Sequence, residues 1–126
     1  MLSNARLTAF LATAHPDRAR AFYEQTLGMR VMSEDDFALV FDANGVELRI
    51  QKVDAFQPQS HTALGWNVPD IRNTVIALLS HGVTPERYPF LSQDPDGVWT
   101  APSGARVAWF KDPDGNLLSV AQYTSS

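Results

Sequence analysis

The stretch FKDPDGNLLSVAQ, Phe110 to Gln122, combines a tight turn with a strand. In its DPDG segment the first aspartate can cap the turn through its side chain, the proline fixes φ, and the glycine accepts a positive φ. Residues 117–122 then follow as a strand with a serine, Ser119, in its middle. This stretch predicts the last hairpin of the chain and raises the question of why a serine stands there.

The same DPDG tetrapeptide occurs once more, at residues 94–97. A calcium-binding loop also begins with spaced aspartates, but it needs a glutamate at its twelfth position. Counting from the two tetrapeptides places Ala105 and Tyr123 at that position. We therefore interpret both tetrapeptides as structural turns.

Outward from these turns, one order of elements appears twice along the chain. The first half reads as a strand at 7–13, a helix from Pro16 to a stop at Gly28, and strands at 29–34, 37–42 and 46–51, with an Asn44-Gly45 hairpin turn. The second half reads as a strand at 64–68, a helix with the apolar stripe Ile71, Val75, Leu78 and Leu79 up to Gly82, and strands at 83–88, 98–101, 105–111 and 117–123.

This repeated order predicts an α+β fold of two tandem βαβββ modules within one domain, residues 1–126. The first module covers about 5–52, an aperiodic linker covers about 53–60, and the second module covers about 61–124. The two helix-stop glycines lie about half a chain apart, which supports the repeat although few letters are identical.

Composition excludes several classes of protein. The 126 residues carry a formal net charge of −4 and no Lys/Arg cluster, so a nucleic-acid surface is not expected. The chain has no cysteine, which excludes disulfides and thiolate chemistry. Its N-terminal apolar run is too short to span a bilayer, so we expect no membrane partner and a cytoplasmic location.

Three stretches together resemble the vicinal oxygen chelate superfamily, which includes glyoxalase I, extradiol dioxygenases and the fosfomycin and bleomycin resistance proteins. They are AHPDRARAFYEQTLGM (14–29), WNVPDIRNTVIALLSHGV (66–83) and FKDPDGNLLSVAQ. The resemblance implies that the sheets of the two modules close into a half-open cup with helices outside. It also implies a ligand or metal inside the cup and a homodimer.

Enzymes of this superfamily typically hold a divalent ion with four strand residues, usually His, Gln or Glu. Counting from the motifs, the resemblance places these positions at Thr8, Arg49 or alternatively Glu47, Ala63, and Ser119. Alanine cannot ligate, a hydroxyl is a poor sole partner, and an arginine repels a cation. We therefore expect no metal; were one present, the resemblance implies zinc, nickel, iron or manganese.

The three histidines differ in their suitability as metal ligands. His15 lies at a strand-to-helix corner, and His81 lies in the last turn of the second helix, where its charge suits the helix dipole. His61 opens the second module and is the only histidine near a ligand strand. The sequence therefore offers at most one histidine to a metal site.

Strand alternation predicts which side chains line the cup. The predicted lining is apolar and aromatic with a few polar groups, as in small-molecule pockets. Trp66 has the opposite parity and is expected in the core, whereas the choice between Trp109 and Phe110 stays open. The candidate residues are Phe10, Glu47, Arg49, Asn67, Trp99, Trp109, Ser119 and Tyr123.

Three functional hypotheses follow from this lining. The first is a metal-free protein that binds a small molecule, with Arg49 pairing a carboxylate or phosphate; alternatively Arg49 pairs only with Glu47 or solvent. The second is a metal-dependent lyase, isomerase or dioxygenase. The third is a metal-free catalyst with Glu47 as general base. The sequence identifies no catalytic residue.

Overall fold

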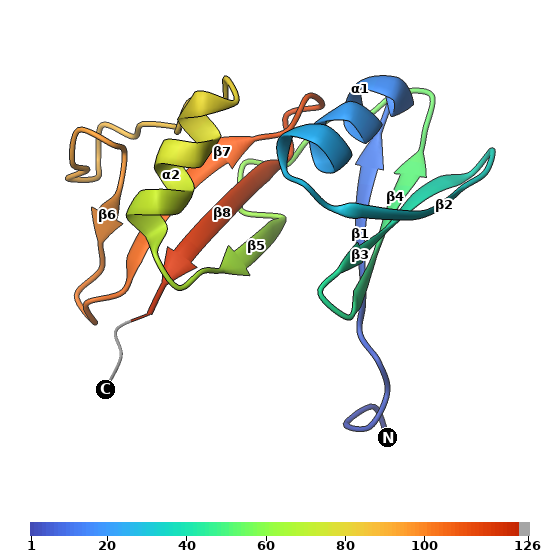
Figure 1. Cartoon of the computed structure of the whole chain (residues 1–126), viewed down its shortest axis with the longest axis horizontal. Helices are drawn as coiled ribbons and strands as arrows, with labels where there is room; N and C mark the ends of the chain where they lie inside the picture. The colour runs from blue at the N-terminus through green and yellow to red at the C-terminus, as the bar shows by residue number, and fades with distance from the viewer. Residues whose placement is uncertain (124–126) are drawn as a thin grey trace. The chain divides into compact units, whose positions relative to one another are not determined.

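A computed structural model of the chain describes residues 1–123 and divides the chain into two compact units, with the boundary between Gln57 and Pro58. That boundary falls inside the segment predicted as a linker. Each unit contains a four-stranded mixed sheet and the element order βαβββ (Figure 1). The α+β fold of two repeated modules is therefore confirmed.

In the first unit, β1 runs parallel to β4, and β4, β3 and β2 follow as an antiparallel meander. The turn between β3 and β4 has positive φ at both Asn44 (54°) and Gly45 (93°), which is the two-residue hairpin geometry predicted for Asn-Gly. The elements are β1 (Thr8–Thr13), α1 (Pro16–Ala21), the π-helical turn η1 (Phe22–Thr26), β2 (Arg30–Glu34), β3 (Ala38–Ala43) and β4 (Val46–Lys52).

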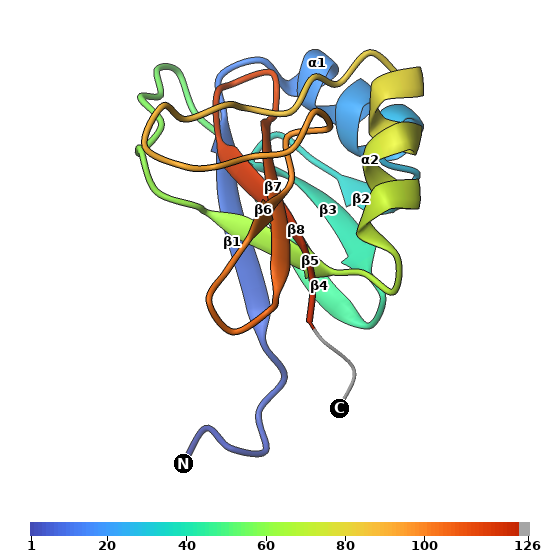
Figure 2. The same cartoon turned by 90° about the vertical axis from the view of Figure 1, so that its left-hand side faces the viewer.

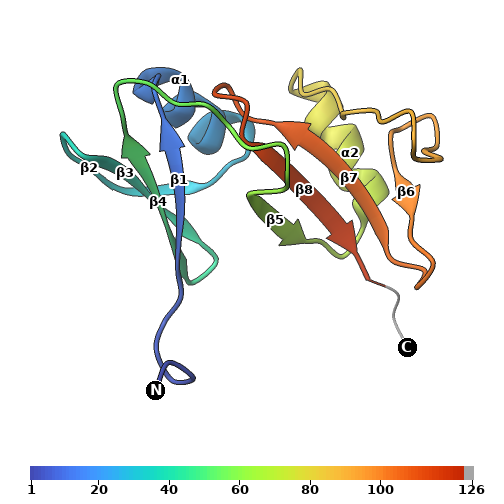
Figure 3. The same cartoon turned by 180° about the vertical axis from the view of Figure 1, so that it is seen from behind.

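The second unit has the same topology, with sheet order β5-β8-β7-β6 against β1-β4-β3-β2 in the first unit. Figure 3 shows β5 and β8 pointing the same way and β7 the opposite way. The strand predicted at 98–101 shortens to two residues. The elements are β5 (Leu64–Asn67), α2 (Ile71–Ser80), β6 (Trp99–Thr100), β7 (Arg106–Lys111) and β8 (Leu117–Gln122).

The strand predicted at residues 83–88 is wrong, because this segment belongs to a loop. Pro85 has no N–H to donate to a neighbouring strand. The side chain of Gln93 replaces the strand partner: its Oε1 accepts from the Tyr88 N–H at 2.7 Å and its Nε2 donates to the Glu86 carbonyl at 2.9 Å. The Glu86 N–H also donates to the Trp109 carbonyl of β7 at 2.7 Å, so isolated hydrogen bonds take the place of strand pairing in this loop.

Each sheet buries one face beneath its own helix. In the first unit the first four residues of β3 are buried, burial alternates along β4, and Tyr23 of η1 packs against Phe41 with ring centroids 5.8 Å apart. In the second unit α2 lies along one side of its sheet (Figure 2) and contacts β7 and β8. The buried set there is Ile71, Val75, Leu78, Ala108, Phe110, Leu118 and Val120.

Two predicted core positions are wrong. Leu79 is 43% exposed, because it lies one position beyond Leu78 and so points away from the buried stripe of α2. Trp66 faces the helix side as its parity predicted, but it is only partly buried and stacks on Phe110 with ring centroids 6.3 Å apart. Phe110, at 2% exposure, takes the central core position instead.

Both DPDG tetrapeptides form the predicted turns. Gly97 and Gly115 have φ of 86° and 89°, a region that favours glycine. Asp94 Oδ1 accepts from two backbone N–H groups that follow it, and Asp112 Oδ1 does the same at 3.0 and 2.9 Å. Asp112 additionally accepts from the Asn116 side chain at 2.8 Å.

The helices of residues 1–123 are all too short or too polar to cross a membrane.

Candidate functional site

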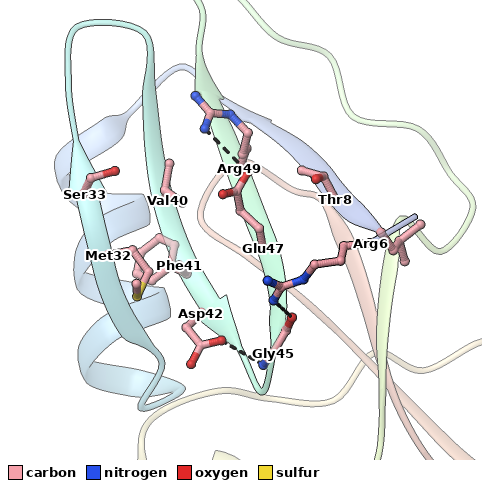
Figure 4. Close-up of a pocket in the computed structure, with 11 residues that line it drawn as sticks. Arg6, Thr8, Met32, Ser33, Val40, Phe41, Asp42, Gly45, Glu47 and Arg49 are labelled. Atoms are coloured by element: carbon pink, nitrogen blue, oxygen red, sulfur yellow. Dashed lines mark hydrogen bonds and ion pairs between the residues drawn. The ribbon is translucent and has the colours of Figure 1, made fainter. Parts of the chain in front are cut away.

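The open face of the first sheet, opposite its helix, carries a hollow of about 430 Å³. Strand β4 builds its centre, because Leu48 and Ile50 turn inward to the core while Glu47 and Arg49 alternate outward. We call it the β4 hollow (Figure 4). Its lining residues are Arg6, Leu7, Thr8, Met32, Ser33, Val40, Phe41, Asp42, Gly45, Glu47 and Arg49.

Arg49 and Glu47 lie on the same strand face and form an ion pair, with 3.6 Å between Arg49 Nη1 and Glu47 Oε2. That distance is too long for a hydrogen bond. The two side chains are 35% and 48% exposed, so water competes for both. The interaction of Glu47 with Arg49 is therefore weak.

The other end of the β4 hollow lies at the Asn44-Gly45 turn. Asp42 Oδ1 accepts from the Gly45 N–H at 2.8 Å, and Arg6 Nη2 donates to the Gly45 carbonyl at 3.0 Å (Figure 4). Asp42 also stands directly opposite Glu47 in the register of β3 and β4. Charged groups of both signs thus line the hollow from the turn to Arg49.

Most lining residues of the β4 hollow were missed from the sequence, among them Asp42, Arg6 and Met32. Asp42 had a usable signal, since an aspartate before Asn-Gly commonly caps the turn. Arg6 lies before β1, where strand alternation says nothing of direction. Met32 lies where the β2–β3 register shifts between Val31 and Ser33, an irregularity that no sequence pattern marked.

Phe10 stands opposite Arg49 in the parallel β1–β4 register and so shares the open face. Its side chain is 55% exposed, and it is not among the residues that line the β4 hollow. A ligand contact for Phe10 stays a prediction.

In the second unit, four candidate residues share the open face of their own sheet. The register pairs Gly65 and Trp109 with Ser119, and it pairs Asn67 with Ala121 in the next row. Trp99 stands opposite Val107, which pairs with Ala121. Phe110 pairs with Leu118 on the helix side, so Trp109 is the one that faces the open side.

Ser119 lies directly over Gly65. A Cβ added at Gly65 would come within 2.6 Å of Ser119 Oγ, closer than real Cβ contacts allow. The small residues at these two positions therefore fit each other across β5 and β8. This packing is a structural reason for the serine in the middle of the last strand.

Trp109 is the centre of an aromatic group on this face. Its Nε1 donates to Thr62 Oγ1 at 3.2 Å, and its ring contacts Tyr88 edge-on at 5.7 Å and Trp99 at 6.0 Å between centroids. Burial raises the pKa of Tyr88 above its usual value. The sequence did not assign Tyr88 to this face, because it was read as part of a strand.

Tyr123 lies beyond the end of β8 and is 64% exposed. Strand alternation therefore does not fix the direction of its side chain, and its place in a pocket stays a prediction. A smaller hollow of about 320 Å³ lies near the start of β8 in the second unit, where Lys111 is paired with Glu86 at 3.4 Å.

The donor groups do not fit a divalent metal ion. At the four expected positions stand Thr8, Glu47 or Arg49, Ala63 and Ser119, which offer one carboxylate at most. That carboxylate faces the positive charge of Arg49 at 3.6 Å. Among residues 1–123, no cluster of three or more His, Asp or Glu side chains is placed to hold an ion.

The histidines take positions away from such a cluster. His81 ends α2, and its Nδ1 lies 2.8 Å from the Ala77 carbonyl, in the structural role predicted for it. His15 precedes α1 and is exposed, as predicted. His61 is exposed before β5 and lines neither hollow described above.

Comparison with known families agrees with this topology. The profile described as Glyoxalase/Bleomycin resistance protein/Dioxygenase superfamily matches residues 6–120. The chain belongs to this superfamily. Comparison with curated proteins gives no match. The resemblance first seen in the turn and helix motifs is thus confirmed, and this superfamily membership covers nearly the whole chain.

Solved structures of the superfamily fold are similar along the whole chain. A bleomycin resistance determinant encoded on the transposon Tn5 is 20% identical with a TM-score of 0.75, covering 97% of this chain and 100% of that one. TnmS3, an antibiotic binding protein from Streptomyces sp. CB03234, is 23% identical with a TM-score of 0.72, covering 98% and 99%. Lactoylglutathione lyase from Agrobacterium tumefaciens is 16% identical with a TM-score of 0.73, covering 94% and 93%. At these identities, the similarity shows the fold alone.

Proposed function

We propose that this member of the glyoxalase/bleomycin resistance/dioxygenase superfamily binds a small organic molecule in the β4 hollow, without a divalent metal ion. The observation that carries the proposal is Arg49, which lines a hollow of about 430 Å³ at a position where the family resemblance implies a metal ligand. Small-molecule pockets span roughly 300–1,000 Å³, so the hollow has a suitable size.

Arg49 is available to a ligand because its present partner is weak. An exposed ion pair of this kind is worth about 0–1 kcal/mol. A carboxylate or phosphate that accepts two parallel hydrogen bonds from the guanidinium forms a stronger contact than Glu47 does at 3.6 Å. The Arg49–Glu47 pair thus holds the guanidinium near the hollow until a ligand replaces Glu47.

The Arg49 guanidinium also gives a reason why the expected metal-ligating residues are missing. In the metal-dependent enzymes of the superfamily, the resemblance implies a divalent cation as the source of positive charge. In this chain a fixed side-chain cation stands at one of those positions. It attracts an anionic group of the ligand while repelling a metal ion from the same space.

The open face of the second sheet is proposed as a further surface for small-molecule contact, within its own unit. Trp99 and Trp109 supply aromatic surface, and Asn67 and Ser119 supply polar groups beside them. The ligand contacts of Phe10 and Tyr123 remain predictions of strand parity.

The names of similar proteins include both binding proteins and an enzyme. The bleomycin resistance determinant and the antibiotic binding protein are named for what they resist or bind, and the lactoylglutathione lyase is named for a reaction. The donor set of this chain supports the binding hypothesis. No observation here favours Glu47 as a general base, since its carboxylate is about half exposed and lies beside Arg49.

The proposal is tested by titrating 15N-labelled protein with a panel of small aromatic and aliphatic carboxylates, phosphates and amines, and with bleomycin. We expect at least one compound to shift the amide signals of Thr8, Gly45 and Arg49 in a saturable way. Arg49→Ala should abolish these shifts for anionic compounds while the free energy of unfolding changes by less than about 1 kcal/mol.

Arg18→Ala is the matched control, because Arg18 is an exposed arginine of the same unit on α1 and does not line the hollow. It should leave binding unchanged. The proposed site is wrong if no compound in the panel shifts the amide signals of the hollow. It is also wrong if Arg49→Ala is unstable and its folded fraction still binds anions.

The homodimer and the cytoplasmic location also belong to the proposal. Both follow from the resemblance and from composition. A sedimentation mass equal to that of a single chain at micromolar concentration would contradict the homodimer.

A further inference from the structure

Charged side chains of both signs line the β4 hollow. Arg6 and Asp42 lie at the Gly45 turn, Glu47 stands opposite Asp42, and Arg49 follows two residues further along β4. The lining contains no other ionisable side chain. Two positive and two negative groups thus share one hollow, and their formal charges cancel.

The two carboxylates of this hollow lie near the Gly45 turn, where Arg6 donates to the Gly45 carbonyl and forms no ion pair within residues 1–123. Asp42 and Glu47 are directly opposite across β3 and β4, and like charges in such a cross-strand pair destabilise a sheet. Arg49 lies 3.6 Å from Glu47 only. Asp42 forms no ion pair within residues 1–123, although Arg30 stands opposite it on β2. An external cation is therefore complementary to the Asp42–Glu47 end.

The two arginines of the hollow have unused hydrogen-bond donors. A guanidinium carries five N–H donors in a planar fork. Within residues 1–123, Arg6 donates to the Gly45 carbonyl at 3.0 Å, and Arg49 has only the long contact to Glu47. An external anion is complementary to Arg49, which lies away from the turn.

We infer that the β4 hollow binds a zwitterion whose ammonium group meets Asp42 and Glu47 and whose carboxylate meets Arg49. The inference rests on the proposed small-molecule binding and deepens it by naming the ligand class. It is carried by the cancelling charges and their order along β4. A purely anionic or purely cationic ligand would leave one end of the hollow unpaired.

The spacing of the charges further narrows the class of ligand. The rows of Asp42 and Arg49 are two residues apart along β4, which is about 7 Å at the rise of a strand. Two residues of extended peptide span about 7 Å as well. Leu7 and Met32 add exposed apolar surface at the edge of the hollow. A dipeptide-sized zwitterion with an apolar side chain fits these features.

Three probes of one skeleton test the inference: alanyl-leucine, its N-acetyl derivative and its C-terminal amide. At pH 7 they carry both charges, the negative charge only and the positive charge only. Dissociation constants come from the amide shifts of Thr8 and Gly45, with Gly115 in the corresponding turn of the second unit as the control signal. We expect alanyl-leucine to bind at least about tenfold more tightly than either derivative, because each charged contact is worth more than a neutral one.

Two charge-neutralising variants test which charged group of the ligand meets Asp42 and which meets Arg49. Asp42→Asn keeps an oxygen for the Gly45 N–H, so the turn is retained while the charge is lost. It should weaken alanyl-leucine and the amide by about tenfold and leave the N-acetyl derivative unchanged. Arg49→Gln should show the reverse pattern. Glu47→Gln replaces Asp42→Asn if the latter loses the Gly45 signal of the folded turn.

Equal binding of the three probes would overturn the zwitterion inference while leaving small-molecule binding intact. The same holds if both variants weaken all probes alike, because the loss would then not follow charge. If none of the three binds, the inference is also wrong, and the wider panel of compounds decides separately whether the hollow binds a small molecule at all.

Discussion

Arg49 shows how one side chain sets the chemistry of a strand face. The alternation of β4 sends Leu48 and Ile50 into the core, each 0% exposed, and this leaves Glu47 and Arg49 on the other side. A slip of one residue would bury both charges, which costs far more than any ion pair returns. The hydrophobic pattern of β4 therefore fixes the direction of its charged residues.

Phe110 and Trp66 both lie on the helix side of the second sheet, but they differ in how deeply they are buried. We expect Phe110→Ala to lower the free energy of unfolding by about 3–5 kcal/mol, because this ring is 2% exposed beneath α2. Trp66→Ala should cost clearly less, since Trp66 is only partly buried. Urea denaturation of both variants measures the difference. Equal losses would mean that Trp66 is as central to the core as Phe110.

The direction of most candidate residues could be predicted from alternation alone. The pairings of Asn67 and Ser119 in the register follow their predicted parity. Alternation failed where the chain turns, so Trp109 and Phe110 could be separated only by the pairing of β7 with β8. Arg6 was beyond prediction, because it precedes the strand.

At the scale of elements, the two DPDG turns allow a matched comparison. Asp112 is 6% exposed and accepts from two backbone N–H groups and the Asn116 amide, whereas Asp94 is exposed. Asp112→Ala should cost about 2–3 kcal/mol, because it leaves buried donors unsatisfied. Asp94→Ala should cost about 1 kcal/mol or less, since water replaces its oxygen. Thermal or urea unfolding measures both, and the opposite order would contradict this account.

Glu34 ties three elements of the first unit together. Its carboxylate accepts from Lys52 Nζ of β4 at 2.8 Å and from Arg20 Nη1 of α1 at 2.7 Å. These hydrogen bonds, that of Lys52 first, lower the pKa of Glu34 below its ordinary value of 4.5. A lowered folded-state pKa means that the stabilising contribution is full above the unfolded-state pKa and is lost as pH falls through the folded-state value.

We therefore expect the stability difference between the native chain and Glu34→Gln to be constant near neutral pH and to shrink below about pH 4.5. Urea midpoints at a series of pH values between about 7 and 3 measure this difference. Asp36→Asn, at an exposed position two residues away, is the control for removing a carboxylate from the same segment. A difference that does not change with pH would show that the Glu34 contacts are not made in solution.

The elements that the sequence predicted well are those with local signals. Asn44-Gly45, both DPDG turns and the glycines that end the helices all stand where predicted. The segment 83–88 failed because its apolar residues suggested a strand, while Pro85 and the side-chain hydrogen bonds of Gln93 favoured a loop. The Gln93 side chain lies five and seven residues along the chain from the two backbone groups that it binds, and such a contact leaves no periodic signal.

At the scale of the whole molecule, one topology is used twice with different chemistry. Both units have the order βαβββ and equivalent sheets. The open face of the first sheet carries paired charges around the β4 hollow, whereas that of the second carries Trp99 and Trp109 beside the small residues Gly65 and Ser119. Turn and core positions define the fold, and the outward positions of the same strands are free to differ.

This freedom explains why the fold was predictable and the function was not. The solved structures reported above share the fold at 16–23% identity, so few letters are needed to specify it. The choice of ligand depends on the strand residues that face away from the core. The turn motifs and the apolar stripes of the helices do not determine which residues stand there.

The metal content of the untagged protein, purified without chelator, tests the central claim most directly. We predict less than about one-tenth of a transition-metal ion per chain by elemental analysis, and no thermal shift on adding nickel, zinc, iron or manganese, because one carboxylate beside an arginine cannot hold such an ion. A stoichiometric metal, or a clear stabilisation by one of these ions, would contradict the claim and would point to His61 and Glu47 as ligands.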